Sequence, residues 1–272
     1  MIKKISTPGF NPNRIFSNNE KQIIARSILE RYTGSKPEEF EKRILLTNFD
    51  HYMGQFEKIT GSSSTVGTAM KASHSRKHGV SLVNFNIGAP TAAIIIETLS
   101  IVNPEAVLLL GMCGGLHRSL KVGDFIIPTA AIRGEGVTNH FMPPEVPALP
   151  TFKIQKFVSQ KLVEAGLDYR TGVVHTTDYR FWEFSDSFKE KLYLQRVIGI
   201  EMESAALFIT GFVSKVPIGA LLLVSDLPLR KKGIKKSAKK VFRKYTDLQL
   251  NLGIQAMSEI GEGGDPIRHY KW

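Results

Sequence analysis

The sequence predicts a single α/β domain whose central sheet is twisted, mostly parallel and covered by helices on both faces. First, continuous apolar runs of strand length alternate with helix-length segments, a pattern typical of strands buried on both faces. Second, 42% of the 272 residues are hydrophobic, which is enough for a large core. Third, no linker, repeat or change in composition divides the chain. We therefore expect one domain over residues 1–272, with residues 1–42 as a helical N-terminal extension.

The first half of the chain opens with a helix and continues with three strands. The helix is predicted over 18–33 from an Asn cap and an apolar stripe of Ile23, Ile24, Ile28 and Leu29. The segments that follow are a strand at 43–49, a Gly/Ser loop at 61–68, a strand at 79–88, a helix at 89–102 and a strand at 105–115 that runs into glycines.

The second half continues the alternation. It contains a strand at 123–136, a helix at 151–166, a strand at 170–177, a strand running into a helix at 197–208, a strand at 216–226 and a helix at 237–260. Pro128 indicates an edge or a bulge in its strand. Ligands of such sheets bind beyond the carboxyl ends of the strands. That rule selects 86–91, 111–116, 176–183 and 225–230 as places where a site is expected.

Charge and cysteine content restrict the partners and the compartment. The net charge is +11, and nine Lys or Arg without an acid lie in 228–245. A solvated helix face, with Val241, Tyr245, Leu248 and Leu252 packed inward, is one interpretation; a funnel for an anionic small substrate and a nucleic-acid patch are the others. No nucleic-acid-binding motif accompanies this segment, so nucleic acid is the weakest of the three. A single cysteine, no apolar stretch of a signal peptide and no apolar run of 18 residues predict a cytoplasmic protein without a membrane span.

Several motifs carry possible chemistry, and each has an ordinary structural interpretation as well. Glu201 and Glu203 lie in the apolar run "VIGIEMESAALF", where carboxylates need a partner. "GMCGG" is either a tight turn or a loop lining a flat ligand. Asp226 ends a core strand, as a cap or as a general acid. The aromatic residues after Thr177 are core or a stacking surface, with Arg180 available to a phosphate. His74 and His78 lack a third ligand, so no metal site is expected.

The order of these motifs resembles the nucleoside phosphorylase and nucleosidase superfamily, whose members break N-glycosidic bonds. The resemblance rests on a strand into "GMCGG" followed by "RGEGVTNHF", "TTDYRFWE", "IGIEMESAAL" and "LLLVSDLP", and it extends over nearly the whole chain. Within the superfamily, "RYTG", "ILLTNFDHYMGQF" and "TTDYRFWE" are most similar to AMP nucleosidases, in the short form without an N-terminal regulatory domain. The resemblance implies hydrolysis of AMP to adenine and ribose 5-phosphate, with no metal or organic cofactor.

The resemblance also implies roles for individual residues. Glu203 accepts hydrogen bonds from the ribose hydroxyls, Met202 packs under the sugar, and Glu201 assists at the ribose or orients Glu203. Asp226, after Ser225, donates a proton to N7 of the purine. The remaining contacts are Gly111, Cys113 and Gly114 along base and sugar, and Tyr179, Arg180 and Phe181 at the base. We expect Glu203 in a cleft near Asp226.

Two departures from the phosphorylases favour water over phosphate as the nucleophile. Phosphorylases hold phosphate with R-x-G-S-x-G, where this chain has Leu109 in place of Arg and Met112 in place of Ser. Asp50 and His51 are the candidates for activating water. His140, Arg133, Arg180 and Arg230 are the candidates for the 5′-phosphate. The alternatives are a nucleoside phosphorylase, a hydrolase of unphosphorylated nucleosides and, more remotely, a non-catalytic nucleic-acid-binding protein. The resemblance implies a homo-oligomer, possibly a hexamer.

Overall fold

The structure is a computed structural model, and it describes residues 19–234 and 239–260. Its centre is a sheet in the order β2-β3-β4-β1-β5-β8-β7-β6-β9, in which β9 returns to pair with β5. The strands are β1 (Arg43–Thr47), β2 (Ser64–Val66), β3 (Lys71–Ser75), β4 (Val80–Asn84), β5 (Ala106–Gly115), β6 (Phe125–Gly134), β7 (Tyr169–Thr177), β8 (Gly199–Glu201) and β9 (Ile218–Asp226).

The sheet is mixed rather than mostly parallel, which corrects the expected fold class in this respect. The pairs β1–β4, β1–β5, β5–β9, β6–β7 and β7–β8 are parallel. The pairs β2–β3, β3–β4, β5–β8 and β6–β9 are antiparallel. Because β5 pairs with both β8 and β9, strands β5, β8, β7, β6 and β9 close into a barrel. A continuous apolar run predicts burial, but it contains no information on strand direction or closure.

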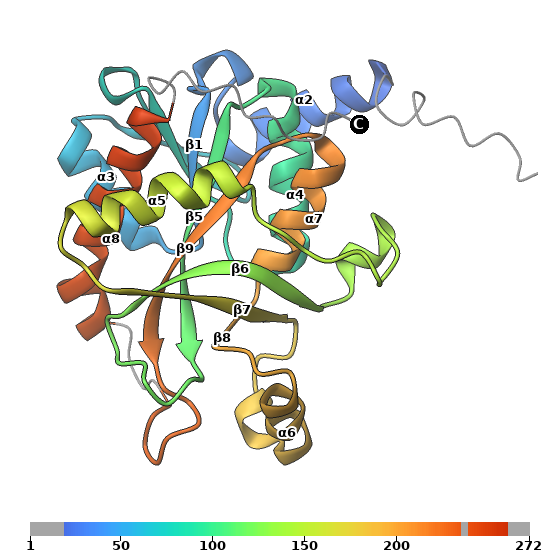
Figure 1. Cartoon of the computed structure of the whole chain (residues 1–272). Helices are drawn as coiled ribbons and strands as arrows, with labels where there is room; N and C mark the ends of the chain where they lie inside the picture. The colour runs from blue at the N-terminus through green and yellow to red at the C-terminus, as the bar shows by residue number, and fades with distance from the viewer. Residues whose placement is uncertain (1–18, 235–238, 261–272) are drawn as a thin grey trace, which may run out of the picture.

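Helices cover the sheet on both sides (Figure 1). One side carries α2 (Asn19–Thr33), α4 (Ala89–Leu99) and α7 (Ser204–Ser214), whose buried side chains join one apolar cluster with the strands. The other side carries α3 (Asp50–Thr60), α5 (Phe152–Glu164) and α8 (Lys239–Glu259), which form a second cluster. A smaller cluster centred on Trp182 lies next to α6 (Asp186–Leu194), which projects below the sheet in Figure 1.

Most predicted elements are present within a few residues of their expected bounds. The bulge predicted at Pro128 is confirmed, because the register between β6 and β7 shifts there. Helices α3 and α6 and the short strands β2 and β3 were not predicted, and β2 lies inside the predicted Gly/Ser loop at 61–68. Tyr52, Met53 and Phe56 of α3 do recur at helical spacing, so that helix had a signal that was missed. The predicted stripe of α2 is only partly right: Leu29 is buried, whereas Ile23 and Ile24 are exposed. The predicted cap Asn18 and residues 235–238 of the basic segment lie outside the described residues.

Across the described ranges, no helix is both long and apolar enough to traverse a bilayer. Within the basic segment, Val241 and Leu252 are buried against the sheet, while Leu248 is exposed. The predicted apolar stripe of α8 is therefore present, and Leu248 lies at its solvent-exposed edge.

Candidate active site

The sheet brings three of the predicted strand ends together around one backbone position, Gly114 of β5. Gly114 is paired with Ile200 of β8 on one side and with Asp226 of β9 on the other. On the far side of β8, Thr176 of β7 is paired with Glu201. The strand that leads into "EMES" and the last residue of β9 therefore flank the same position of β5, although β8 runs antiparallel to β5.

Glu201 is a buried carboxylate whose acceptors are used by the protein itself. One oxygen, Oε2, accepts the backbone N–H groups of Glu203 and Ser204, at 2.8 and 2.6 Å. The other, Oε1, accepts the hydroxyl of Thr176, which in turn accepts the N–H of Ala205 at 2.9 Å. These N–H groups begin α7, so Glu201 and Thr176 cap that helix and place negative charge at its positive end. Of its two expected roles, orientation of Glu203 is the one that these contacts support.

Glu203 precedes the first turn of α7 and is 3% exposed, more enclosed than the open cleft expected from the sequence. Its Oε1 accepts the N–H of Gly88 at 2.9 Å, and its Oε2 accepts the N–H of the half-buried Met202 at 3.2 Å. Gly88 lies just before α4 with φ +106°, a conformation that favours glycine. The side chain of Asn48 also hydrogen-bonds to the Glu203 carboxylate.

The pKa of Glu203 is raised to about 7, first by burial and then by the charge of Glu201. The pKa of Glu201 is also raised by burial, although its hydrogen bonds oppose the change. Two neighbouring buried carboxyls with raised pKa values are a feature typical of functional sites.

Asp226 ends β9 opposite Gly114, the residue that pairs with Ile200 on its other side. Its Oδ1 accepts the hydroxyl of Ser225 at 2.8 Å, and the same hydroxyl is 3.2 Å from the carbonyl oxygen of Cys113. The Cys113 side chain itself belongs to the apolar core. Asp226 is half-buried, which leaves its carboxyl more accessible than those of Glu201 and Glu203.

The predicted glycine contacts divide into two kinds. A side chain at Gly114 would meet Pro228 at 3.1 Å, so the absence of a Cβ allows the segment after β9 to approach. At Gly111, a Cβ would lie 3.0 Å from Leu222, and the carbonyl oxygen accepts the side chain of Gln249. Gly111 therefore packs against Leu222 and Gln249 in the structure, and its contact with base and sugar stays a prediction.

The aromatic segment after β7 is mostly exposed. Tyr179 and Phe181 are 45% and 66% exposed, whereas Trp182 is buried in the small cluster next to α6. Arg180 forms an ion pair with Glu183 at 3.0 Å, with 60% of its own side chain exposed. The predicted stacking residues therefore lie on an accessible surface that follows directly from Thr177.

Two of the predicted phosphate-binding arginines have structural partners instead. Arg133 bonds to the side chains of Thr138 and Asn139 and to the carbonyl oxygens of Met142, Pro143 and Val146, so its guanidinium holds the loop after β6. Arg230 donates from Nη2 to the carbonyl oxygens of Arg118 and Leu120. For Arg133 the loop engages all three nitrogens of a guanidinium that has five donors, which makes it the weaker candidate for the phosphate. His140 is exposed on that loop.

The two candidates for water activation are in different environments. Asp50 accepts Asn84 at 2.6 Å and forms an ion pair with Lys71 at 2.9 Å, and the bond from Lys71 lowers the pKa of Asp50. The ring of His51 lies 5.1 Å from that of Phe242, and its Nε2 is buried without a partner among the described residues.

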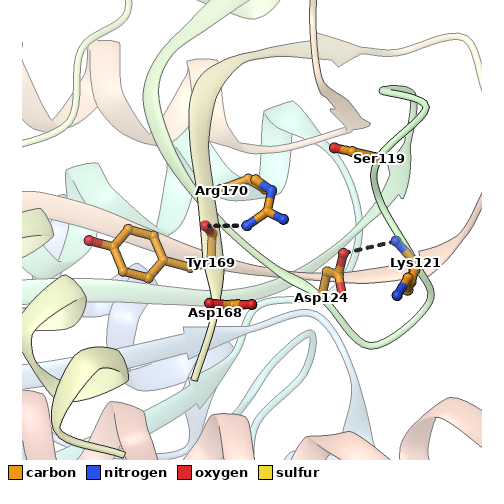
Figure 2. A pocket seen from close by; sticks show the side chains of 6 residues that line it. All are labelled: Ser119, Lys121, Asp124, Asp168, Tyr169 and Arg170. Carbon is orange, nitrogen blue, oxygen red and sulfur yellow. Dashed lines mark hydrogen bonds between the residues drawn. The ribbon is translucent and has the colours of Figure 1, made fainter. Parts of the chain in front are cut away.

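A polar hollow elsewhere on the surface involves none of the predicted site residues. Figure 2 shows its lining: Ser119, Lys121, Asp124, Asp168, Tyr169 and Arg170. It lies at the beginning of β7, whereas Thr176 lies at the end of that strand. Its volume of about 120 Å³ is below the range of roughly 300–1,000 Å³ typical of ligand sites.

Comparison with known proteins identifies the family. The profile of the phosphorylase superfamily matches residues 43–250. This chain belongs to the phosphorylase superfamily. A solved structure of AMP nucleosidase from Bacteroides thetaiotaomicron is 40% identical, with a TM-score of 0.77 over 89% of this chain and 98% of that one. AMP nucleosidase from Escherichia coli K12 is 28% identical over 289 residues, 89% of this chain and 60% of its own length. The chain thus spans about 60% of the length of that curated relative.

Other members of the superfamily share the fold at lower identity. A uridine phosphorylase structure from Vibrio fischeri has a TM-score of 0.72 at 17% identity, which supports the fold alone. Asn48, Gly88 and Thr176, which contact the two glutamates, were not named as site residues, although Gly88 and Thr176 fall inside the predicted ranges 86–91 and 176–183. All three lie where a buried strand ends or just beyond it, so the strand-end rule contained a signal for them.

Proposed function

We propose that this chain hydrolyses the N-glycosidic bond of AMP and releases adenine and ribose 5-phosphate. The observation that carries the proposal is Glu203, a buried carboxylate held by Gly88, Met202 and Asn48 at the strand ends that also carry Asp226. Similarity to AMP nucleosidases over 89% of the chain supports the choice of substrate.

The two acids divide the chemistry between sugar and base. As the bond from C1′ to N9 lengthens, the ribosyl group becomes oxocarbenium-like and electron-poor. Glu203, bound to the ribose hydroxyls, stabilises charge that develops only in the transition state. Asp226 donates a proton to N7, because adenine leaves far more readily as a neutral base than as an anion.

The environment of β5 favours hydrolysis over phosphorolysis. Leu109 and Met112 occupy the positions where phosphorylases carry the phosphate-binding Arg and Ser, and both side chains are buried in apolar clusters. Neither can bind an anion, so water is the nucleophile in this proposal.

Of the two candidates for activating the water, His51 is the better base, because Lys71 and Asn84 occupy Asp50 and lower its pKa.

The 5′-phosphate requires basic partners, and Arg180 and His140 remain the stronger candidates. Arg180 has an exposed guanidinium next to Tyr179 and Phe181, where a base could stack. The basic residues after Arg230 would attract an anionic nucleotide. A cytoplasmic homo-oligomer, possibly a hexamer, without a nucleic-acid partner completes the proposal.

A direct assay tests it. The purified protein is incubated with AMP, adenosine and IMP, with and without inorganic phosphate, and free base and sugar product are measured. We expect adenine and ribose 5-phosphate from AMP at a rate that phosphate does not increase. Phosphate-dependent release of base from adenosine would support a phosphorylase instead, and no turnover of any substrate would contradict the enzyme assignment.

A further inference from the structure

Asn48 follows the last residue of β1 and contacts Glu203 with only half of its amide. The side chain hydrogen-bonds to the Glu203 carboxylate, and since an ionised carboxylate only accepts, the group that faces it is the Nδ2 amine. The other half of the amide, Oδ1, is buried and has no hydrogen-bond partner within residues 19–234 and 239–260. A buried carbonyl oxygen of this kind normally has a partner.

The acceptor capacity of Glu203 points to what that partner is. A carboxylate offers about four acceptor positions. The N–H groups of Gly88 and Met202 and the amine of Asn48 already use three. About one position is left, whereas the ribose of a nucleotide presents two adjacent hydroxyl groups. Glu203 alone therefore cannot accept both without giving up a contact that holds it.

We propose that Asn48 is a ribose-binding residue whose Oδ1 accepts one hydroxyl of the 2′,3′-diol while Glu203 accepts the other. Nδ2 and Oδ1 belong to one planar amide, so a side chain whose amine contacts Glu203 keeps its carbonyl oxygen close to that carboxylate. Two acceptors that lie close together can each take one of two neighbouring hydroxyls. Asn48 then has two separable functions: its amine positions Glu203, and its carbonyl oxygen selects for a complete diol. The inference rests on the proposed function, since it assumes a ribosyl substrate.

The experiment compares Asn48→Ala and Asn48→Ser with the unmodified protein on AMP, 2′-deoxy-AMP and 3′-deoxy-AMP. Loss of the Asn48 amine should lower kcat/KM equally for all three substrates. Loss of the Asn48 carbonyl oxygen should lower kcat/KM only for substrates that carry the ribose hydroxyl that this oxygen accepts. We expect the penalty in kcat/KM on AMP to exceed the penalty on one deoxy analogue by about tenfold, the size of one buried hydrogen bond. On the other analogue the penalty should equal that on AMP. Asn251→Ala serves as the matched control, because this residue is exposed and its side chain, within the described residues, bonds to the carbonyl of Asp247 on its own helix.

Equal penalties on all three substrates, within about twofold, would overturn the inference, because Asn48 would then act only on Glu203 or on the attacking water. Asn48→Ser provides a second variant if the alanine variant does not fold. Failure of the proposed function gives a different result, namely no hydrolysis of AMP by the unmodified protein. In that event the same comparison is made on the Kd values of the three nucleotides by calorimetry, where a substrate-dependent penalty supports the inference and a uniform one overturns it.

Discussion

Replacing Glu203 by Gln should make the protein more stable at alkaline pH while removing its proposed catalytic carboxylate. Burial and the neighbouring Glu201 raise the pKa of Glu203 from 4.5 to about 7 in the folded protein. The protonated form therefore fits the folded state better than the ionised form. The stability that comes from protonation is fully present below pH 4.5 and is lost as the pH rises through about 7.

The size of this effect follows from the gap between the two pKa values. A change from 4.5 to about 7 corresponds to about 3 kcal/mol of unfolding free energy. In the Glu203→Gln variant, the new amide would place an amine against the N–H of Gly88 or Met202, which costs about 1 kcal/mol at every pH. The variant should therefore be slightly less stable than the unmodified protein at pH 4.5 and about 2 kcal/mol more stable at pH 8.

Urea denaturation of both proteins at several pH values between 4.5 and 8 measures this directly. Taking the difference between them removes the titration of all other groups except Glu201, with which Glu203 titrates as a pair. Glu201→Gln is the companion variant that shows how much of the effect belongs to its partner. If the difference in unfolding free energy stays constant within about 0.5 kcal/mol across this range, the pKa of Glu203 is not raised and the reasoning fails.

Three other substitutions test the remaining assignments. Glu201→Gln removes the negative charge next to Glu203 and so lowers the pKa of Glu203; the acid limb of kcat/KM against pH should move to lower pH, and an unmoved limb would contradict the coupling. Asp226→Asn should reduce adenine release by roughly a hundredfold or more with little change in urea denaturation, whereas unchanged turnover would remove it as the general acid. Arg133→Ala should destabilise the fold by about 1–3 kcal/mol but leave the preference for AMP over adenosine unchanged. A preference shifted toward adenosine would restore Arg133 as a phosphate ligand.

The strand ends could be predicted because they depend on local patterns. Apolar runs give the buried strands, and the polar residue that follows each run gives the edge where a ligand binds. Asn48 and Gly88 carried this signal in the sequence, yet their partner is more than a hundred residues away, so their role became visible only when Glu203 was placed beside them.

Closure of the barrel and the partners of the arginines could not be predicted. Continuous apolar runs are typical of parallel strands because such strands are buried on both faces. Strands β5 and β9 and the start of β6 are buried in this way although the pairs β5–β8 and β6–β9 are antiparallel, so the pattern did not reveal their direction. Arg133 and Arg180 look alike in the sequence because each lies close to the carboxyl end of a strand, Arg133 one residue before the end of β6 and Arg180 three residues after the end of β7. A guanidinium binds whichever carbonyl oxygens the chain folds around it, and for Arg133 these come from residues 142–146.

The two acids of "EMES" have different functions in this proposal: Glu201 holds the start of α7, and Glu203 is the carboxylate that acts on the substrate. In a continuous strand, the side chains of Glu201 and Glu203 would point to the same face. However, β8 ends at Glu201, and Glu203 already belongs to the start of α7. Glu201 is consequently satisfied by the first N–H groups of the helix and by Thr176. Glu203 is held instead by the N–H groups of Gly88 and Met202, and it stays close to a second buried charge, which makes its ionised form costly in the folded protein. A carboxylate held in this way gains most when positive charge develops next to it, so the instability of the resting site and its capacity to stabilise an oxocarbenium-like ribose have the same physical origin.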